Sequence, residues 1–350
     1  MLSTFIAILI VVAFTALVLL PLVPGFMELF RPTDEEPPFI RLDYTKDPRY
    51  FGRSFRSMLR NVLPDEHVLG DCKVTLSKEE ILKVSNSLHV RIEEEVDQTL
   101  YVADTLTVGD GANLHNEAYS KGNIVLGRNV SVRALAGDGN IEAGAGLVVS
   151  RWIDSEGDMR LGPDGSLGIS ATAEGRLVLG PNTRFQRLFG NPVSLGDFVY
   201  KDWELPAPDQ EALIEPEKVT NISDVCTYVR HFSTEPEQIV TGDVVSKGDV
   251  NVRELASILG SVKAHGNVVV GSGALITGNL FCEKDVVLKP GARVIGNVFS
   301  QGNVLLHSDC VIGRPGHVKS LIVRKGLSVH RGAAIYGYVL TEGMGTTEDA

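Results

Sequence analysis

The feature that most constrains this chain is a repeat of 18 residues. In the second half, Gly242, Gly260, Gly278 and Gly296 follow one another at intervals of 18, and each precedes a Val or Leu by two residues. In the first half, the glycines of GNIVLG, GNIEAG, GDMRLG and GRLVLG keep intervals of 17 or 18 residues. A spacing held over this many units indicates stacked structural repeats rather than a bundle of helices.

Within each 18-residue unit, an apolar or small residue returns every six residues. From Val244 this series continues through Val250, Ala256, Val262, Val268, Ala274, Leu280, Val286, Ala292, Val298, Val304 and Cys310. A second, usually apolar position two residues later places both side chains on one face of a short strand. Three such strands complete one coil, so we predict an all-β fold, a triangular parallel β-helix or solenoid.

The same series divides the chain into segments. In the first half it runs from Leu100 to Ala136, drops one residue and resumes at Ile141. We predict two β-helix blocks of five coils each, and the pattern leaves open whether they stack or fold back side by side. The predicted segments are 1–26 (membrane anchor), 27–99 (juxtamembrane region with a short helical preface), 100–189 (first block), 190–241 (Pro- and acid-rich linker or cap), 242–340 (second block) and 341–350 (polar tail).

Residues 2–23 carry no charge and would extend about 33 Å as a helix, enough to cross a hydrocarbon core of about 30 Å. A cleaved signal peptide would need a positively charged start, and no Lys or Arg precedes this stretch. We therefore predict an uncleaved transmembrane helix, with the Lys and Arg residues after it favouring a cytoplasmic C-terminal part. Its apolar residues include Leu2, Phe5, Ile6, Leu9, Ile10, Phe14, Leu17 and Leu20.

The region after the anchor contains an amphipathic helical pattern. Apolar residues recur at helical spacing between Phe51 and Val62, and a basic stripe beside them is formed by Arg49, Arg53, Arg56 and Arg60. Such a helix can lie on anionic lipid beside its own anchor. Alternatively, its apolar face docks on the following domain and the arginines are solvated. A second short helix is predicted to begin at Ser77, where Ser77-x-x-Glu80 matches a capping box.

The second block, from GDVVSKGDVNV to GNVFSQGNVLLHSDCVIG, resembles the bactofilin, or polymer-forming cytoskeletal, family. The resemblance is best over residues 242–313 and weaker over 100–185. It implies a right-handed β-helix that assembles end to end into nucleotide-independent bacterial filaments, in some members with an N-terminal membrane-binding segment. The chain departs from the usual pattern of that family in two ways: it has two blocks joined by a long linker, and it has a helical preface. Either feature could cap an end and prevent filament growth.

A six-residue period also suits the left-handed hexapeptide fold of acyltransferases, but that fold favours a small residue directly after the apolar position. This chain has larger residues there, such as Val269, Phe281 and Phe299. The residues that could act in catalysis are more simply interpreted as structural. We interpret Cys282 and Cys310 as small core residues, and the others as solvated turn residues: His265, His307, His317, His330, Asp154, Glu156 and Asp158. No catalytic residue, cofactor or metal site is predicted.

The sequence therefore favours a structural protein over an enzyme. A formal net charge of −11 provides no overall positive field for nucleic acid. We expect a single-pass protein of the bacterial inner membrane that forms a homo-oligomer or polymer and positions envelope or division proteins. The alternatives are a hexapeptide-type acyltransferase or polysaccharide-modifying β-helix enzyme, and a monomeric membrane adaptor.

Self-association is predicted at the last coil. A solenoid ends in unpaired strand edges and an open apolar cross-section, which must be capped or paired with another chain. The tail after residue 340 looks too short to form a helical cap. The predicted homotypic surface consists of Ala333, Ile335, Tyr336, Val339 and Leu340.

Overall fold

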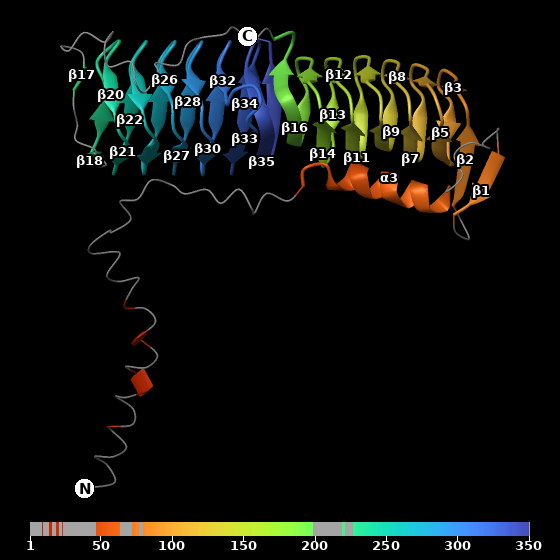
Figure 1. Cartoon of the computed structure of the whole chain (residues 1–350), viewed down its shortest axis with the longest axis horizontal. Coiled ribbons are helices and arrows are strands. Elements are labelled where there is room, and N and C mark those ends of the chain that lie inside the picture. Colours follow the sequence, from red (N-terminus) through yellow and green to blue (C-terminus); the bar gives the residue numbers. More distant parts are fainter. Residues whose placement is uncertain are drawn as a thin grey trace.

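The computed structural model describes residues 47–63, 72–76, 80–198, 219–220 and 227–349, together with Leu9, Phe14, Thr15, Leu19, Leu20 and Val23. These residues form a long parallel β-solenoid, with helix α3 (Tyr50–Val62) lying along one side (Figure 1). The predicted all-β solenoid is confirmed. Figure 1 shows the solenoid as one continuous rod.

Residues 81–195 form what we call the N-terminal ladder. Each strand pairs in parallel with the strand one coil later, so three stacks of strands run along the rod; one of them is β3–β6–β8–β10–β12–β15–β16. The strands are β2 (Ile81–Ser85), β3 (Leu88–Val90), β4 (Glu95–Val96), β5 (Thr99–Val102), β6 (Leu106–Val108), β7 (Asn113–Ser120), β8 (Ile124–Leu126), β9 (Ser131–Gly137), β10 (Ile141–Ala143), β11 (Val148–Ser155), β12 (Met159–Leu161), β13 (Ser166–Leu167), β14 (Ser170–Ala173), β15 (Leu177–Leu179) and β16 (Arg184–Leu195). A short strand, β1 (Cys72–Thr75), pairs antiparallel with β2 and covers one edge of the first coil.

Residues 219–348 form the C-terminal ladder, which is built in the same way. Its strands are β17 (Val219–Thr220), β18 (Thr227–Val229), β19 (Phe232–Ser233), β20 (Ile239–Thr241), β21 (Val244–Ser246), β22 (Val250–Val252), β23 (Ser257–Leu259), β24 (Val262–Ala264), β25 (Val268–Val270), β26 (Leu275–Ile276), β27 (Leu280–Cys282), β28 (Val286–Leu288), β29 (Arg293–Val294), β30 (Val298–Ser300), β31 (Val304–Leu306), β32 (Val311–Ile312), β33 (Lys319–Val323), β34 (Leu327–His330) and β35 (Ala334–Glu348). One coil of this ladder carries an insertion of five residues, because Val298 pairs with Leu321 at a spacing of 23 instead of 18.

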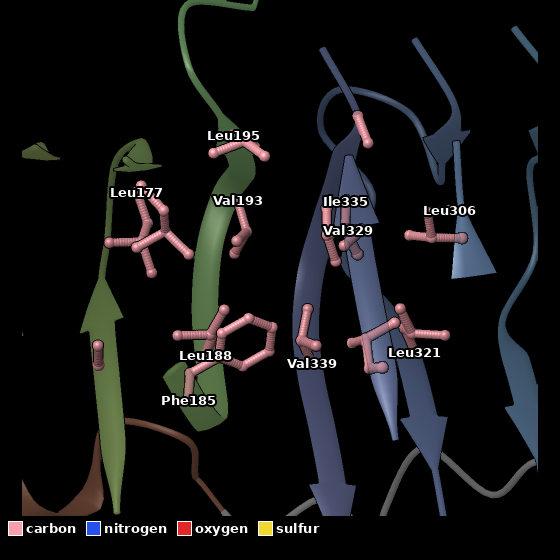
Figure 2. Packing of buried hydrophobic residues seen from close by; sticks show 14 of the residues in the cluster. Leu177, Phe185, Leu188, Val193, Leu195, Leu306, Leu321, Val329, Ile335 and Val339 are labelled. Atoms are coloured by element: carbon pink, nitrogen blue, oxygen red, sulfur yellow. The ribbon is translucent and has the colours of Figure 1, made fainter. Parts of the chain in front are cut away.

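The two ladders meet at their last coils. β16 and β35 pair antiparallel, with Leu188 opposite Val339 and Val193 opposite Ile335. We call this junction the seam. Figure 2 shows apolar side chains of both ladders facing one another across it, so the core continues from one ladder into the other. The first coils of both ladders therefore lie at the two ends of the rod (Figure 1).

The core consists of the inward series predicted from the six-residue period. Every member from Val244 to Cys310 is at most 1% exposed, and Cys282 and Cys310 lie in the core as expected. One assignment in the first half is wrong. The chain drops its residue between Val132 and Ala134, so Leu135 enters the core and Ala136 faces outward instead.

The turns explain why Asn, Asp and Gly mark the repeat. An Asn or Asp side chain accepts a hydrogen bond from the backbone N–H of the equivalent residue one coil later, as in Asn140 N to Asn123 Oδ1 (2.9 Å) and Asn297 N to Asn279 Oδ1 (2.9 Å). These bonds form columns along the corners of the rod and satisfy donors that the strands leave unpaired. At Gly260 a Cβ would overlap the carbonyl of Gly242 in the previous coil, so only glycine fits.

Several predicted boundaries are wrong. The predicted helix at Ser77 is replaced within the described residues by strand β2, which starts the N-terminal ladder at Ile81 instead of residue 100. Strands β17 to β20 occupy part of the predicted linker, and most of the predicted polar tail belongs to β35. The ladders are therefore longer than five coils each, because short apolar pairs such as Leu88 and Val90 extend the pattern beyond its clearest region.

The predicted membrane anchor lies almost entirely outside the described residues. Of the eight apolar residues named for it above, only Leu9, Phe14 and Leu20 are described, and all three are exposed. Within the part of the chain that is described, no helix is both long and apolar enough to cross a bilayer. The anchor remains a prediction.

Candidate functional site

Helix α3 packs on the outer surface of the N-terminal ladder (Figure 1). Its apolar stripe buries Phe55 and Leu59, and Leu63 follows directly after the helix. Phe55 meets Trp152 edge to face, with ring centroids 5.7 Å apart. The covered surface consists of outward-facing residues from one stack of strands: Leu82, Val84, Tyr101, Tyr119, Ala134, Ala136 and Trp152. This second apolar layer, outside the solenoid core, holds the helix against the rod.

A buried carboxylate, Asp154, lies beneath the helix at 2% exposure. Arg49 donates to it twice, from Nε to Oδ1 at 2.8 Å and from Nη2 to Oδ2 at 3.0 Å. Arg56 donates to Oδ2 from the other side, and the Thr172 hydroxyl donates to Oδ1 at 2.6 Å. One carboxylate therefore joins two helical turns to strand β11, and all its partners are charged or strongly polar.

The arginines extend this network to neighbouring coils. Arg56 Nε donates to Asp138 Oδ1 at 2.7 Å and its Nη2 to the carbonyl of Gly137 at 2.6 Å. Arg49 also pairs with Glu174. The Tyr119 hydroxyl donates to Asp138 Oδ2 at 2.6 Å. The network therefore crosses several coils and fixes the position of α3 along the rod.

The pKa values of these groups agree with stable ion pairs. Burial alone would lower the pKa of Arg49, but its hydrogen bonds and charge attraction to Asp154 and Glu174 outweigh burial and raise the pKa. The pKa of Arg56 is likewise raised by Asp154 and Asp138 against the effect of burial. Burial, followed by the hydrogen bond to Asp138, raises the pKa of Tyr119. Both arginines stay charged at any physiological pH, and their charges hold α3 to the carboxylates of the ladder; we call this network the clamp.

Gly52 makes the close approach of the helix possible. It is buried between Arg49 and Arg56, and a Cβ at this position would overlap the Asp154 carboxylate. Glycine in the middle of a helix usually costs about 1 kcal/mol relative to alanine. Its presence here is explained by the contact with Asp154.

These observations decide between the two interpretations of the basic helix. Docking on the following domain is what the structure shows, and Arg49 and Arg56 are buried at 3% exposure instead of being solvated. The interpretation of Asp154 as a solvated turn residue is wrong, because it lies within β11 on the face that α3 covers. Arg53 and Arg60 remain exposed, and Arg53 pairs with Asp47 at 2.8 Å.

A cavity of about 520 Å³ lies beside the start of α3, next to the seam. It is bounded by the beginning of the helix, by β14 and by the two seam strands. Its walls are Asp47, Pro48, Tyr50, Phe51, Ser170, Thr172, Arg187 and Tyr338. This volume is in the range of small-molecule sites.

The predicted homotypic surface is already occupied within the chain. Ala333, Ile335, Tyr336 and Val339 are at most 3% exposed, and Leu340 is half-buried. β35 pairs with β16 across the seam, with Leu340 opposite Arg187. The premise of an open C-terminal coil is therefore wrong, because the last coil of the N-terminal ladder covers it.

The four candidate histidines do not assemble into a catalytic group. His265 pairs with Glu283 at 2.8 Å and His317 is exposed. His307 and His330 come together on adjacent coils, with ring centroids 5.1 Å apart, which the sequence analysis missed. Burial, His330 and Lys289 lower the pKa of His307. Among the described residues, no group of three or more His, Cys, Asp or Glu side chains could hold a metal ion.

Comparison with known proteins gives no relative: no family model, no curated protein and no solved structure matches this chain. The resemblance to bactofilins therefore stays a hypothesis that rests on the repeat sequence alone.

Proposed function

We propose that this protein is a membrane-attached structural scaffold whose rods associate through their ends and position other proteins of the bacterial envelope. The observation that carries this proposal is the placement of the seam, of α3 and of the first coils along the rod. The last coils are joined in the seam, α3 covers one side, and the first coils of both ladders lie at the ends.

Asp47 and Pro48, where the continuous described chain begins, lie near the middle of the rod. Tyr50, at the start of α3, lines the same cavity as Arg187 and Tyr338 of the seam strands. A membrane anchor preceding Asp47 would therefore hold the rod close to its centre and leave both ends accessible. The clamp around Asp154 would transmit this attachment to the rod, because it joins α3 to several coils.

Both ends carry strands that pair on one side only within the described residues. β3 and β4 pair only with β6 and β7, and β17, β18 and β19 only with β20, β21 and β22. Edge strands of this kind present backbone donors and acceptors that another strand can use. Association through rod ends is therefore the form of assembly that this architecture favours.

Electron microscopy and sedimentation of the full chain in phosphatidylcholine nanodiscs test the proposal, with and without proline at the end strands. Phe232 N and Thr234 N both donate into the rod, so the N–H of Ser233 between them points away from it. The N–H of His89 in β3 follows the same alternation, since Leu88 N donates inward to Thr105 O. Ser233→Pro and His89→Pro remove these outward donors and no inward one.

We expect wild-type rods to join end to end. A protein that carries both proline substitutions should remain as single rods. Ser233→Ala and His89→Ala keep the backbone N–H and serve as matched controls that should still assemble. Circular dichroism and unfolding temperature check that each variant is folded. Wild-type protein that stays as single rods at high concentration would contradict the scaffold proposal and favour a monomeric adaptor.

A further inference from the structure

The cavity between α3 and the seam has walls of two kinds. Pro48, Tyr50 and Phe51 contribute an apolar side, and Tyr50 and Phe51 form an edge-to-face pair with centroids 5.8 Å apart. The lining also includes polar groups from three strands: Ser170 and Thr172 of β14, Arg187 of β16 and Tyr338 of β35. A space with an apolar wall and a few convergent polar groups is the usual form of a small-molecule site.

The charged residues that line this cavity differ in whether they have a partner of opposite charge. Asp47 is neutralised by Arg53 and also accepts a hydrogen bond from the backbone of Arg49. Thr172 donates its hydroxyl to Asp154. Arg187, by contrast, is exposed and has no carboxylate partner in the described part of the chain, unlike Arg49, Arg56 and Arg133. The cavity therefore offers one unneutralised guanidinium beside a phenol.

Tyr338 lies within the electrostatic reach of Arg187. Burial raises the pKa of the Tyr338 hydroxyl, and the positive charge of Arg187 opposes that shift. The phenol is therefore a neutral donor at physiological pH. A guanidinium and a phenol hydroxyl together suit a carboxylate or phosphate group.

We propose that this cavity binds an anionic amphiphile, with a phosphate or carboxylate group held by Arg187 and Tyr338 and an apolar body against Pro48, Tyr50 and Phe51. A lipid headgroup with part of its chain and a free phosphorylated or carboxylated apolar metabolite share this chemistry. The site rests on the cavity alone and does not depend on the end-to-end association proposed above.

Calorimetric titration of the full chain in phosphatidylcholine nanodiscs tests the site, with octyl phosphate as the probe and empty nanodiscs as the blank. We expect octyl phosphate to bind with a Kd of about 100 µM, a value ordinary for a ligand of this size. Octanol should bind at least about tenfold more weakly because it lacks the charge that Arg187 receives. Inorganic phosphate, which lacks the apolar body, should show no measurable binding.

Arg187→Gln should weaken the binding of octyl phosphate at least about tenfold and leave the affinity for octanol unchanged. Arg184→Gln is the matched control, because Arg184 is an exposed arginine of the same strand outside the cavity, and its affinity should equal wild type. Equal affinity of wild type and Arg187→Gln, or equal binding of octanol and octyl phosphate, would overturn the proposal. So would the absence of binding at millimolar octyl phosphate by a folded wild-type protein.

Nanodiscs that contain phosphatidylglycerol identify the source of the anion. Loss of octyl phosphate binding in them, with binding retained in phosphatidylcholine, supports the site and assigns it to a lipid headgroup. Unchanged binding in both supports the site and assigns it to a soluble amphiphile. Because the readout is binding to single rods, this result is independent of whether the rods associate.

Discussion

Asp154 is buried and accepts hydrogen bonds from Arg49, which directly precedes α3, and from Arg56 within α3. A buried ion pair costs desolvation energy for each partner, so its net contribution to stability is small when it is intact. Removing one partner is costly, because the remaining charges stay buried. At the residue scale, the clamp therefore mainly fixes the position of α3 and adds little net stability. Mutation of a single partner is nevertheless expected to destabilise the protein strongly.

Asp154→Asn should destabilise the docked helix by about 3 kcal/mol or more, since it leaves two buried guanidinium groups short of negative charge. Urea unfolding followed by Trp152 fluorescence in a Trp203→Phe background measures the change. Asp158→Asn is the control, because Asp158 is partly exposed and pairs with an exposed arginine, Arg176, so the loss should not exceed about 1 kcal/mol. Similar losses for both variants would argue against the clamp.

The cysteines should differ sharply in reactivity. Burial raises the pKa of Cys282 to about 11 and that of Cys310 to about 12, whereas Cys72 is exposed. Thiolate is the reactive form, so at pH 8 iodoacetamide should label Cys72 rapidly and the two core thiols only after unfolding. Mass spectrometry of a Cys226→Ser background gives the rates. Rapid labelling of Cys282 in the native protein would contradict its place in the core.

At the element scale, α3 is a short helix whose stability comes from docking, because isolated helices of this length are marginal in water. Its apolar stripe provides the contact with the ladder, and Gly52 sets how closely the helix approaches. The element is therefore specified by its fit to β11 more than by its intrinsic helix propensity.

Gly52→Ala tests this fit, because the close contact and the helix propensity predict changes in stability of opposite sign. On an unhindered helix face the substitution stabilises by about 1 kcal/mol, but here the added Cβ must displace the Asp154 carboxylate or the helix. We expect net destabilisation in urea unfolding and faster proteolysis within 50–62. Ser57→Ala, at an exposed position of the same helix, should be neutral or stabilising. A stabilised Gly52→Ala variant would exclude the close contact.

The sequence predicts elements well where period and burial coincide, and poorly where contacts are made between distant segments. The six-residue period places Val244 to Cys310 in the core, because each coil repeats the same environment. It does not reveal that Asp154 lies under α3, since the partners are about a hundred residues apart and one acidic residue beside the turn Gly157 looks solvated. The seam was missed for the same reason: an antiparallel pairing of two last coils has no periodic signal.

At the scale of the whole molecule, the antiparallel pairing of β16 and β35 determines what the protein can present to partners. It encloses the apolar residues of both last coils and leaves the first coils of the two ladders at opposite ends (Figure 1). Asp47 and Pro48, which precede α3, lie near the centre of the rod and line the cavity. In our proposals, assembly uses the two ends of the rod, whereas membrane attachment and ligand binding lie together near its centre.

Deletion of residues 1–26 should release the protein into the soluble fraction, because burial of the apolar side chains of 2–23 in lipid is the strongest membrane contact that the sequence contains. Fractionation at low and high salt measures the release. The buried Arg49 and Arg56 contribute nothing to lipid binding in this account. Full retention of the truncated protein on membranes would show that Arg53, Arg60 or a membrane partner is the true anchor.

The distance between the two first coils tests the central claim, a single rod joined through its last coils. Spin labels at Ile92→Cys and Glu235→Cys, two exposed positions near opposite ends, are placed in a background in which Cys72 and Cys226 are replaced by serine. With about 4.8 Å per coil along both ladders, pulsed electron spin resonance of spin-diluted protein should give a distance of roughly 60 Å. Ladders folded back side by side would bring the labels within about 35 Å, and that result would contradict the account.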